Sequence, residues 1–143
     1  MLKIYYKIWV DAIFKIKSNP EQKKSWKFYA TIYMSMVMAL NLWFFSFLAL
    51  TFKLKIPYYP FEINIFSSNK INSFISFFAS YLLPILVANY FFIFWKNKYE
   101  KLLLLYKHQE GKLFSRYFLV SILAYIFYFL IVFIIFKLFP ERF

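Results

Sequence analysis

Cysteine is absent from this 143-residue sequence, and glycine occurs only once. The absence of cysteine excludes disulfides, thiol nucleophiles and thiolate metal sites. A single glycine cannot build the glycine-rich loop that cradles a phosphate group. With five prolines and no repeat or low-complexity run, the chain also offers no flexible linker between domains. We therefore expect residues 1–143 to form a single domain.

Charge is missing from three long stretches of the chain. No Asp, Glu, Lys, Arg or His occurs in residues 28–52, 71–95 or 117–136. A helix rises about 1.5 Å per residue, so roughly 20 apolar residues cross the ~30 Å hydrocarbon layer of a bilayer. All three stretches reach that length. They predict transmembrane helices at 28–52, 71–95 and 117–137, and hence an all-α integral membrane protein.

The residues that are abundant point to the same class of protein. Hydrophobic residues make up 63% of the sequence and aromatic residues 27%. Soluble domains contain about 45–50% apolar residues, and a soluble core of this size could not hide so many large side chains. The composition therefore favours a membrane protein.

The first 18 residues have the pattern of an amphipathic helix lying in the membrane interface. Charged residues recur every four positions, where i,i+4 pairs can form along one polar stripe: Lys3, Lys7, Asp11 and Lys15. The apolar residues that share the other side are Ile4, Ile8, Trp9, Ala12, Ile13 and Ile16. Because Lys15 and Lys17 interrupt the place where a signal peptide stays apolar, we expect no cleavage. The helix would anchor the first span or, alternatively, dock a cytoplasmic partner.

Basic residues are concentrated on one side of the predicted spans. Thirteen precede the first span or lie in the loop 96–116, and five lie in the outer loop 53–70 or after the third span. The positive-inside rule then predicts a multi-pass protein of a bacterial-type inner membrane, with a cytoplasmic N-terminus and an outer C-terminus.

The formal net charge of +12 requires no nucleic acid as a partner. Each basic residue close to the anionic inner leaflet gains about 1 kcal/mol, so membrane lipids account for the charge. The residues predicted to contact anionic lipid are Lys15, Lys17, Lys23, Lys24, Lys27, Lys96, Lys98, Lys101 and Arg116.

Small and polar residues in the spans predict how the helices pack. In the second span they recur every four positions, at Asn72, Ser76, Ser80, Pro84 and Ala88. Small residues allow helices to approach closely in lipid, so we expect a tight three-helix bundle. A path for a solute along this stripe is the alternative.

Besides Asn72, two asparagines lie inside the predicted spans, and we assign both to helix packing. Pro84 cannot donate to the carbonyl of Ser80, and Asn41 of the first span lies at a depth where its amide could do so. Asn89 lies closer to the cytoplasmic surface. A ligand or ion contact is the alternative role for both asparagines.

The connecting segments carry their own signals. Asn19 can cap a helix that begins near Pro20. The outer loop contains two prolines and a single acid, Glu62, and we expect it to fold back on the membrane surface or over the bundle. The loop 96–116 predicts a helical extension of the second span that ends at Gly111, with His108 as a solvated side chain.

No group of residues predicts catalysis, a cofactor or a metal site. The acidic residues are scattered along the chain, at Asp11, Glu21, Glu62, Glu100, Glu110 and Glu141. None pairs by its spacing, and the single histidine has no second ligand beside it. We therefore do not expect an enzyme.

Two hypotheses for the function follow. The first is a non-catalytic accessory or structural subunit of a membrane complex, which binds a membrane-protein partner through its spans. The alternative is a self-assembling pore or membrane-perturbing protein, in which the small-residue stripe makes contacts between copies. Replacing Ser76, Ser80 and Ala88 by leucine would distinguish the two: it would unfold a monomer but only dissociate an oligomer.

Overall fold

The computed structural model describes residues 2–51 and 61–138. In these ranges the chain is helical and forms no strand. The helices are α1 (Leu2–Ser18), α2 (Trp26–Thr51), α3 (Asn69–Phe77), α4 (Leu83–Asn89), α5 (Lys98–Leu105) and α6 (Lys112–Leu138). Three segments are long and apolar enough to cross a membrane: α2, the run from α3 to α5, and α6. The predicted class of an all-α, multi-pass membrane protein is therefore confirmed.

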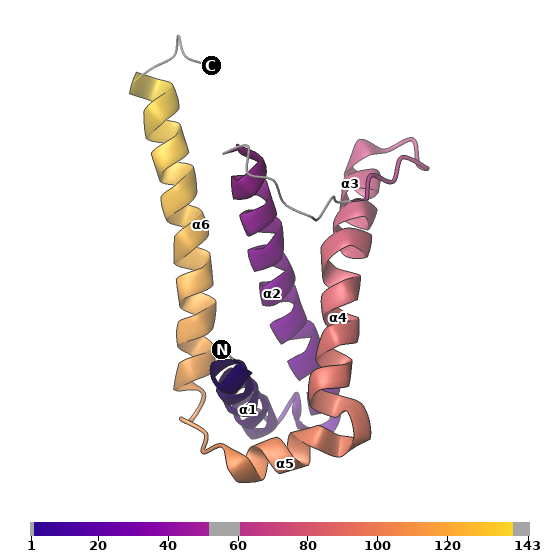
Figure 1. Cartoon of the computed structure of the whole chain (residues 1–143), viewed down its shortest axis with the longest axis vertical. Coiled ribbons are helices and arrows are strands. Elements are labelled where there is room, and N and C mark those ends of the chain that lie inside the picture. Colours follow the sequence, from indigo (N-terminus) through magenta and orange to yellow (C-terminus); the bar gives the residue numbers. More distant parts are fainter. Residues whose placement is uncertain (1, 52–60, 139–143) are drawn as a thin grey trace.

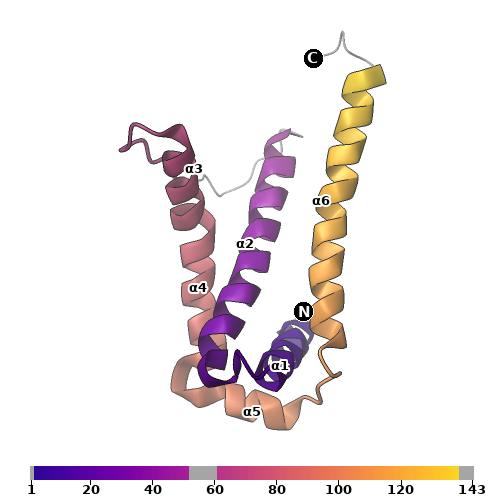
Figure 2. The ribbon, with the colours of Figure 1, turned by 180° about the vertical axis from the view of Figure 1, so that it is seen from behind.

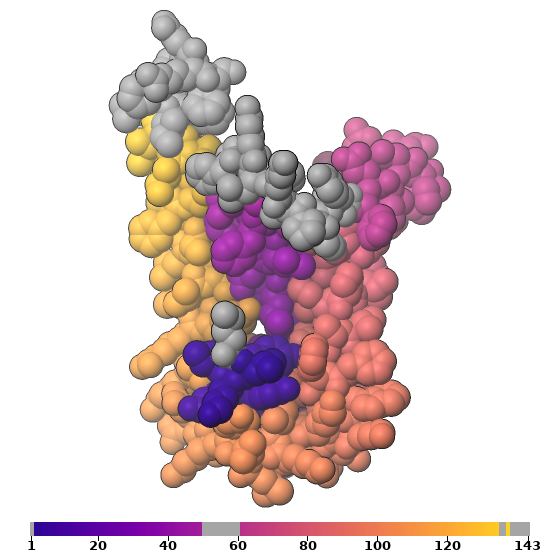
Figure 3. All heavy atoms as spheres, viewed as in Figure 1, coloured from indigo at the N-terminus to yellow at the C-terminus, as the bar shows by residue number. Residues whose placement is uncertain are grey.

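The three candidate spans stand side by side, with α2 between the other two (Figure 1). Figure 2 shows the same order from behind, with α4 and α6 on opposite sides of α2. The helices α1 and α5 lie across one end, and the last described turn of α6 reaches the opposite end. Figure 3 shows α1 seated against α5 and the start of α6.

The expected tight bundle is wrong, because α6 stands largely apart. We compare the share of buried residues in the most apolar stretch of each span. This share is 33% for α2 and 22% for the second span, but only 6% for α6. In lipid, helices associate only where side chains fit or form hydrogen bonds. Most side chains of α6 are large phenylalanines, leucines and isoleucines, which leave few places for close approach.

The core lies at the end of the molecule that α1 covers. Trp9, Ala12, Ile13 and Ile16 are buried in one cluster with residues of α2, of the second span and of α5: Ala30, Met34, Ile93 and Tyr99. The predicted amphipathic helix is thus present, but its apolar side faces the other helices. Ile4 departs from the predicted face, since 63% of it is exposed.

The second span contains a π-helical turn, Phe78–Leu82, that changes which residues face α2. A π turn holds one more residue than an α turn, so the buried face moves on by one position. Asn72 is buried before this turn, Ser80 and Tyr81 within it, and Asn89 and Ile93 after it.

This shift corrects the predicted stripe of small residues. Pro84, one of its members, is exposed, and Ala88 is only partly buried. Pro84 stands directly after the π turn, at the start of α4, where a missing N–H costs least.

The end of the second span also differs from the prediction. Lys96 and Asn97 have positive φ angles of 52° and 55°, which turn the chain after a second π turn, Tyr90–Phe94. Such angles interrupt a helix. The predicted helical extension therefore exists as a separate helix, α5, which runs across the end of the molecule.

Gly111 does not end that helix, since α5 already stops at Leu105. It has a φ angle of 81° and stands immediately before α6. At the start of the first span, the backbone N–H of Glu21 donates to Asn19 Oδ1 at 3.1 Å, and a 3-10 turn, Lys23–Ser25, leads into α2.

Candidate functional site

A buried carboxylate on α1 holds the start of α6. Asp11 is 1% exposed. Its Oδ1 accepts hydrogen bonds from the backbone N–H groups of Gln109 at 2.6 Å and Gly111 at 3.0 Å. Its Oδ2 accepts from Leu113 at 2.7 Å and Phe114 at 3.1 Å. The carboxylate thus satisfies backbone donors at the N-terminus of a helix, where the helix dipole also favours negative charge.

This arrangement corrects the polar stripe predicted for α1. Asp11 faces inward, while Lys3, Lys7 and Lys15 are exposed. The carboxylate is used by the backbone of another segment, not by an i,i+4 pair. Nothing in the sequence pattern signals this role, because the four backbone donors lie about 100 residues away.

Lys15 makes a second connection between α1 and α6, one turn after Asp11. Its Nζ donates to Ser115 Oγ at 2.5 Å. A Cβ atom built on Gly111 would lie 2.8 Å from Lys15 Cδ, closer than real Cβ contacts. Gly111 is therefore required both by its positive φ angle and by the close approach of α1.

Asn89 joins three helices inside the core. Its Nδ2 donates to Ser35 Oγ of α2 at 2.8 Å, and Tyr5 of α1 donates to its Oδ1 at 2.8 Å. Asn89 is 1% exposed. Burial also raises the pKa of Tyr5, so its hydroxyl remains a donor.

Asn41 connects α2 to α6, not to the second span. Its Nδ2 donates to Tyr117 Oη and to Ser121 Oγ, both at 3.0 Å, and Tyr125 donates to its Oδ1 at 2.9 Å. Both amide protons are used in these bonds. The expected bond to the carbonyl of Ser80 is therefore wrong, because α6 supplies the partners.

The polar residues in the N-terminal half of the second span hold the segment of residues 61–66. Ser80 Oγ accepts from the N–H of Phe61 at 2.7 Å, and Ser76 Oγ accepts from the N–H of Ile63 at 2.9 Å. Asn72 bonds both backbone groups of Phe66. The described part of the predicted outer loop thus folds back on the second span, and residues 52–60 lie outside the described ranges.

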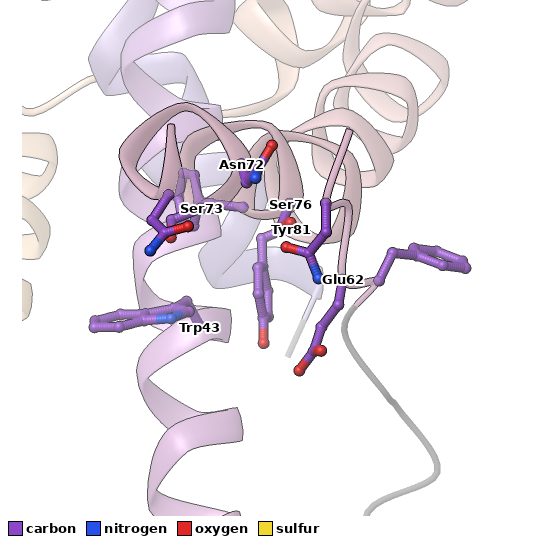
Figure 4. A pocket seen from close by; sticks show the side chains of 10 residues that line it. Trp43, Glu62, Asn72, Ser73, Ser76 and Tyr81 are labelled. Carbon is purple, nitrogen blue, oxygen red and sulfur yellow. The ribbon is translucent and has the colours of Figure 1, made fainter. Parts of the chain in front are cut away.

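A cavity of about 380 Å³ lies beside this segment (Figure 4). Its polar lining includes Glu62, Asn64, Asn69, Ser73 and Ser76, together with rings of Trp43 and Tyr81. Glu62 is the one titratable acid among the described residues that line it.

The basic residues predicted to contact anionic lipid all lie at the end that α1 and α5 cover. Lys17 Nζ is 4.1 Å from the ring centre of Trp26, and Lys27 Nζ is 4.7 Å from that of Tyr99. Lys98 Nζ donates to the carbonyl of Phe91 at 3.2 Å. Lys15, which bonds to Ser115, and the other five members are exposed: Lys23, Lys24, Lys96, Lys101 and Arg116.

His108 lies at the same end, where its ring stacks on Phe14 with the ring centres 3.6 Å apart. Within residues 2–51 and 61–138, no group of three His, Asp or Glu side chains could hold a metal ion.

Comparison of the chain with protein-family models, with curated proteins and with solved structures finds no match.

Proposed function

We propose that this protein is a non-catalytic accessory or structural subunit of a membrane complex, and that α6 contacts its partner. The observation that carries the proposal is the exposure of α6, a helix of 27 residues with 6% of its most apolar stretch buried. One narrow strip, around Asn41 and Phe44, fixes α6 to α2. The first turn of α6 is held by α1, and the exposed side chains beyond it include Leu123, Phe127 and Ile131, which other membrane helices can contact.

The direction of the polar side chains supports an accessory role over a pore. Asn41 and Asn89 bond to other helices of the same chain, and Ser80 bonds to the segment 61–66. From residue 117 to residue 134 the exposed side chains of α6 are apolar, among them Leu123, Phe127 and Ile131. A ring of such chains would lack a polar lining for water or ions.

The charge distribution supports the proposed location in an inner membrane. The described basic residues gather at the end of α1 and α5, while Lys70 and Lys137 lie toward the other end. By the positive-inside rule, the first end faces the cytoplasm. Labelling of single cysteines introduced at Lys24 and at Asn64 in intact cells tests this orientation, since only the second site would react with an impermeant reagent.

Purification in mild detergent, with chemical crosslinking and mass spectrometry, tests the proposed function. We expect stoichiometric recovery of a second membrane protein. Discrete homo-oligomers without another protein would contradict the proposal and favour the self-assembling alternative, which ion-flux measurements in liposomes would then examine.

A further inference from the structure

An apolar groove lies between α2 and α6 on the half of the spans nearer α1. Its volume is about 680 Å³. It is lined by side chains of α2 and α6, with Lys15 of α1 among them: Tyr33, Met36, Val37, Leu40, Phe114, Ser115, Phe118 and Leu119. From Tyr33 to Leu40 the helix rises roughly 10 Å.

A second, more polar cavity adjoins this groove. Its volume is about 420 Å³, and three of its residues, Lys15, Tyr33 and Phe114, also line the groove. Its other residues belong to the end of α1 and the turn that follows: Ile16, Ser18, Asn19 and Gln22. The two cavities therefore form one site with an apolar part and a polar part.

The groups at the junction of the two cavities suit an anion. Lys15 is the one charged side chain among the described residues that line either cavity. Its ammonium group has three donors, of which Ser115 Oγ takes one. Tyr33 Oη accepts a hydrogen bond from Gln22 Nε2 at 3.1 Å, so its own proton can be donated to a ligand.

We propose that this site binds an anionic phospholipid, with the headgroup phosphate at Lys15 and an acyl chain in the groove. The phosphate oxygens would accept from Lys15 and Tyr33, in charge-assisted bonds that are the stronger kind. The acyl chain would cover Met36, Val37 and Phe118, of which Met36 and Phe118 are 40% and 46% exposed. The proposal goes beyond the accessory role, because the ligand is a lipid and not a protein.

The dimensions of the groove favour a lipid over a helix of a partner. A spanning helix runs along about 30 Å of hydrocarbon. The groove extends for roughly a third of that length, because the next residue of α2, Asn41, bonds to three side chains of α6. The site places one cation, Lys15, beside an apolar groove. This combination matches an amphiphile with an anionic headgroup and an acyl chain.

Native mass spectrometry of the full chain in a neutral detergent tests the proposal. The probes are dioctanoyl phosphatidylglycerol, dioctanoyl phosphatidylcholine and inorganic phosphate. We expect one tightly bound phosphatidylglycerol per chain and about tenfold weaker binding of it to Lys15→Gln. The matched control Lys7→Gln, which removes an exposed lysine of the same helix that lines neither cavity, should bind as the unchanged chain does.

A second pair of variants tests the groove itself. Met36→Trp fills it, and Ile32→Trp adds the same ring one turn away on α2, at a residue of nearly equal exposure, 40% against 39%. We expect Met36→Trp to abolish binding of phosphatidylglycerol and Ile32→Trp to leave it unchanged. If Met36→Trp fails to fold, Leu119→Trp, which fills the groove from α6, replaces it.

Three results would overturn the proposal. Equal binding of phosphatidylcholine and phosphatidylglycerol would show that Lys15 does not recognise an anion. Binding of inorganic phosphate as tight as that of the lipid, with no effect of Met36→Trp, would show a soluble phosphate site. A homodimer that forms with Ile32→Trp but not with Met36→Trp would show that a second copy fills the groove.

Discussion

The carboxylate of Asp11 lies 3.0 Å from the backbone nitrogen of Gly111, one hundred positions further along the chain. Through this contact α1 supplies the cap that the first turn of α6 cannot make for itself. Contacts between α1 and α6 are more extensive than those between α2 and α6. The short N-terminal helix therefore fixes the base of a long helix that the other spans barely cover.

Replacing Asp11 should destabilise the protein strongly. Asp11→Ala leaves four backbone donors without their acceptor, and Asp11→Asn turns an amide NH₂ toward some of them. We expect either variant to lose about 3 kcal/mol in the free energy of unfolding. Thermal unfolding in detergent, followed by circular dichroism, measures the loss. The control Lys7→Ala, at an exposed position of α1, should stay within about 0.5 kcal/mol. An Asp11→Ala variant as stable as this control would contradict the capping role.

Gly111 should tolerate no side chain. Gly111→Ala meets both a positive φ angle and the Lys15 side chain, so we expect a loss of about 1–2 kcal/mol in the free energy of unfolding. Gly111→Asn separates the two causes, because asparagine accepts positive φ but its Cβ meets the same atoms. We expect Gly111→Asn to be destabilised as well. Full stability of that variant would show that the approach of Lys15 is unimportant.

The burial of the Tyr5 hydroxyl should make stability depend on alkaline pH. Burial raises the pKa of Tyr5 above its ordinary value of 10. The folded state therefore keeps a proton that the unfolded chain releases above about pH 10. The resulting stabilisation is fully present below that pH and is lost as the pH rises toward the folded pKa.

Tyr5→Phe isolates this effect from that of the other tyrosines. It should cost about 1 kcal/mol near neutral pH, because Asn89 Oδ1 loses its donor. Above pH 10 its stability should fall less steeply than that of the unchanged chain. Melting temperatures measured from pH 7 to 11 give the pH dependence of stability for Tyr5→Phe and for the unchanged chain. If the two melting temperatures fall in parallel above pH 10, the pKa of Tyr5 is not raised.

The π turn in the second span predicts opposite outcomes for two leucine substitutions. Ser80 is buried and bonds to Phe61, so Ser80→Leu should destabilise by about 2 kcal/mol. Pro84 is exposed, so Pro84→Leu should change the free energy of unfolding by less than about 1 kcal/mol. An unbroken stripe of four-residue spacing would instead make both substitutions costly. Thermal unfolding of the two variants in the same detergent decides between these patterns.

The sequence predicts the spans well, because an uncharged stretch of this length has few other stable environments than a bilayer. It also predicts α1, whose apolar residues recur with the helical period. It does not predict the direction of Asp11, since spacing along one helix carries no information about backbone donors of a distant segment. The four-residue spacing from Asn72 to Ala88 fails to predict the buried residues for a different reason. One extra residue in the π turn rotates the part of the second span that follows it, so other residues of that part are buried.

The partners of the two asparagines show the same limit. Depth in the membrane placed Asn41 level with Pro84, but the structure brings it to Tyr117 and Tyr125 of α6. Depth alone cannot choose between two neighbouring helices.

Site-specific photocrosslinking from α6 tests the proposed accessory role most directly. Benzoylphenylalanine at Phe127, which is 61% exposed, probes the outer surface of α6, and the same group at Phe44, 8% exposed, is the matched control inside the chain. We predict that only the Phe127 variant crosslinks, in intact membranes, to a different membrane protein in high yield. Crosslinks from Phe127 only to lipid or to a second copy of this chain would contradict the account.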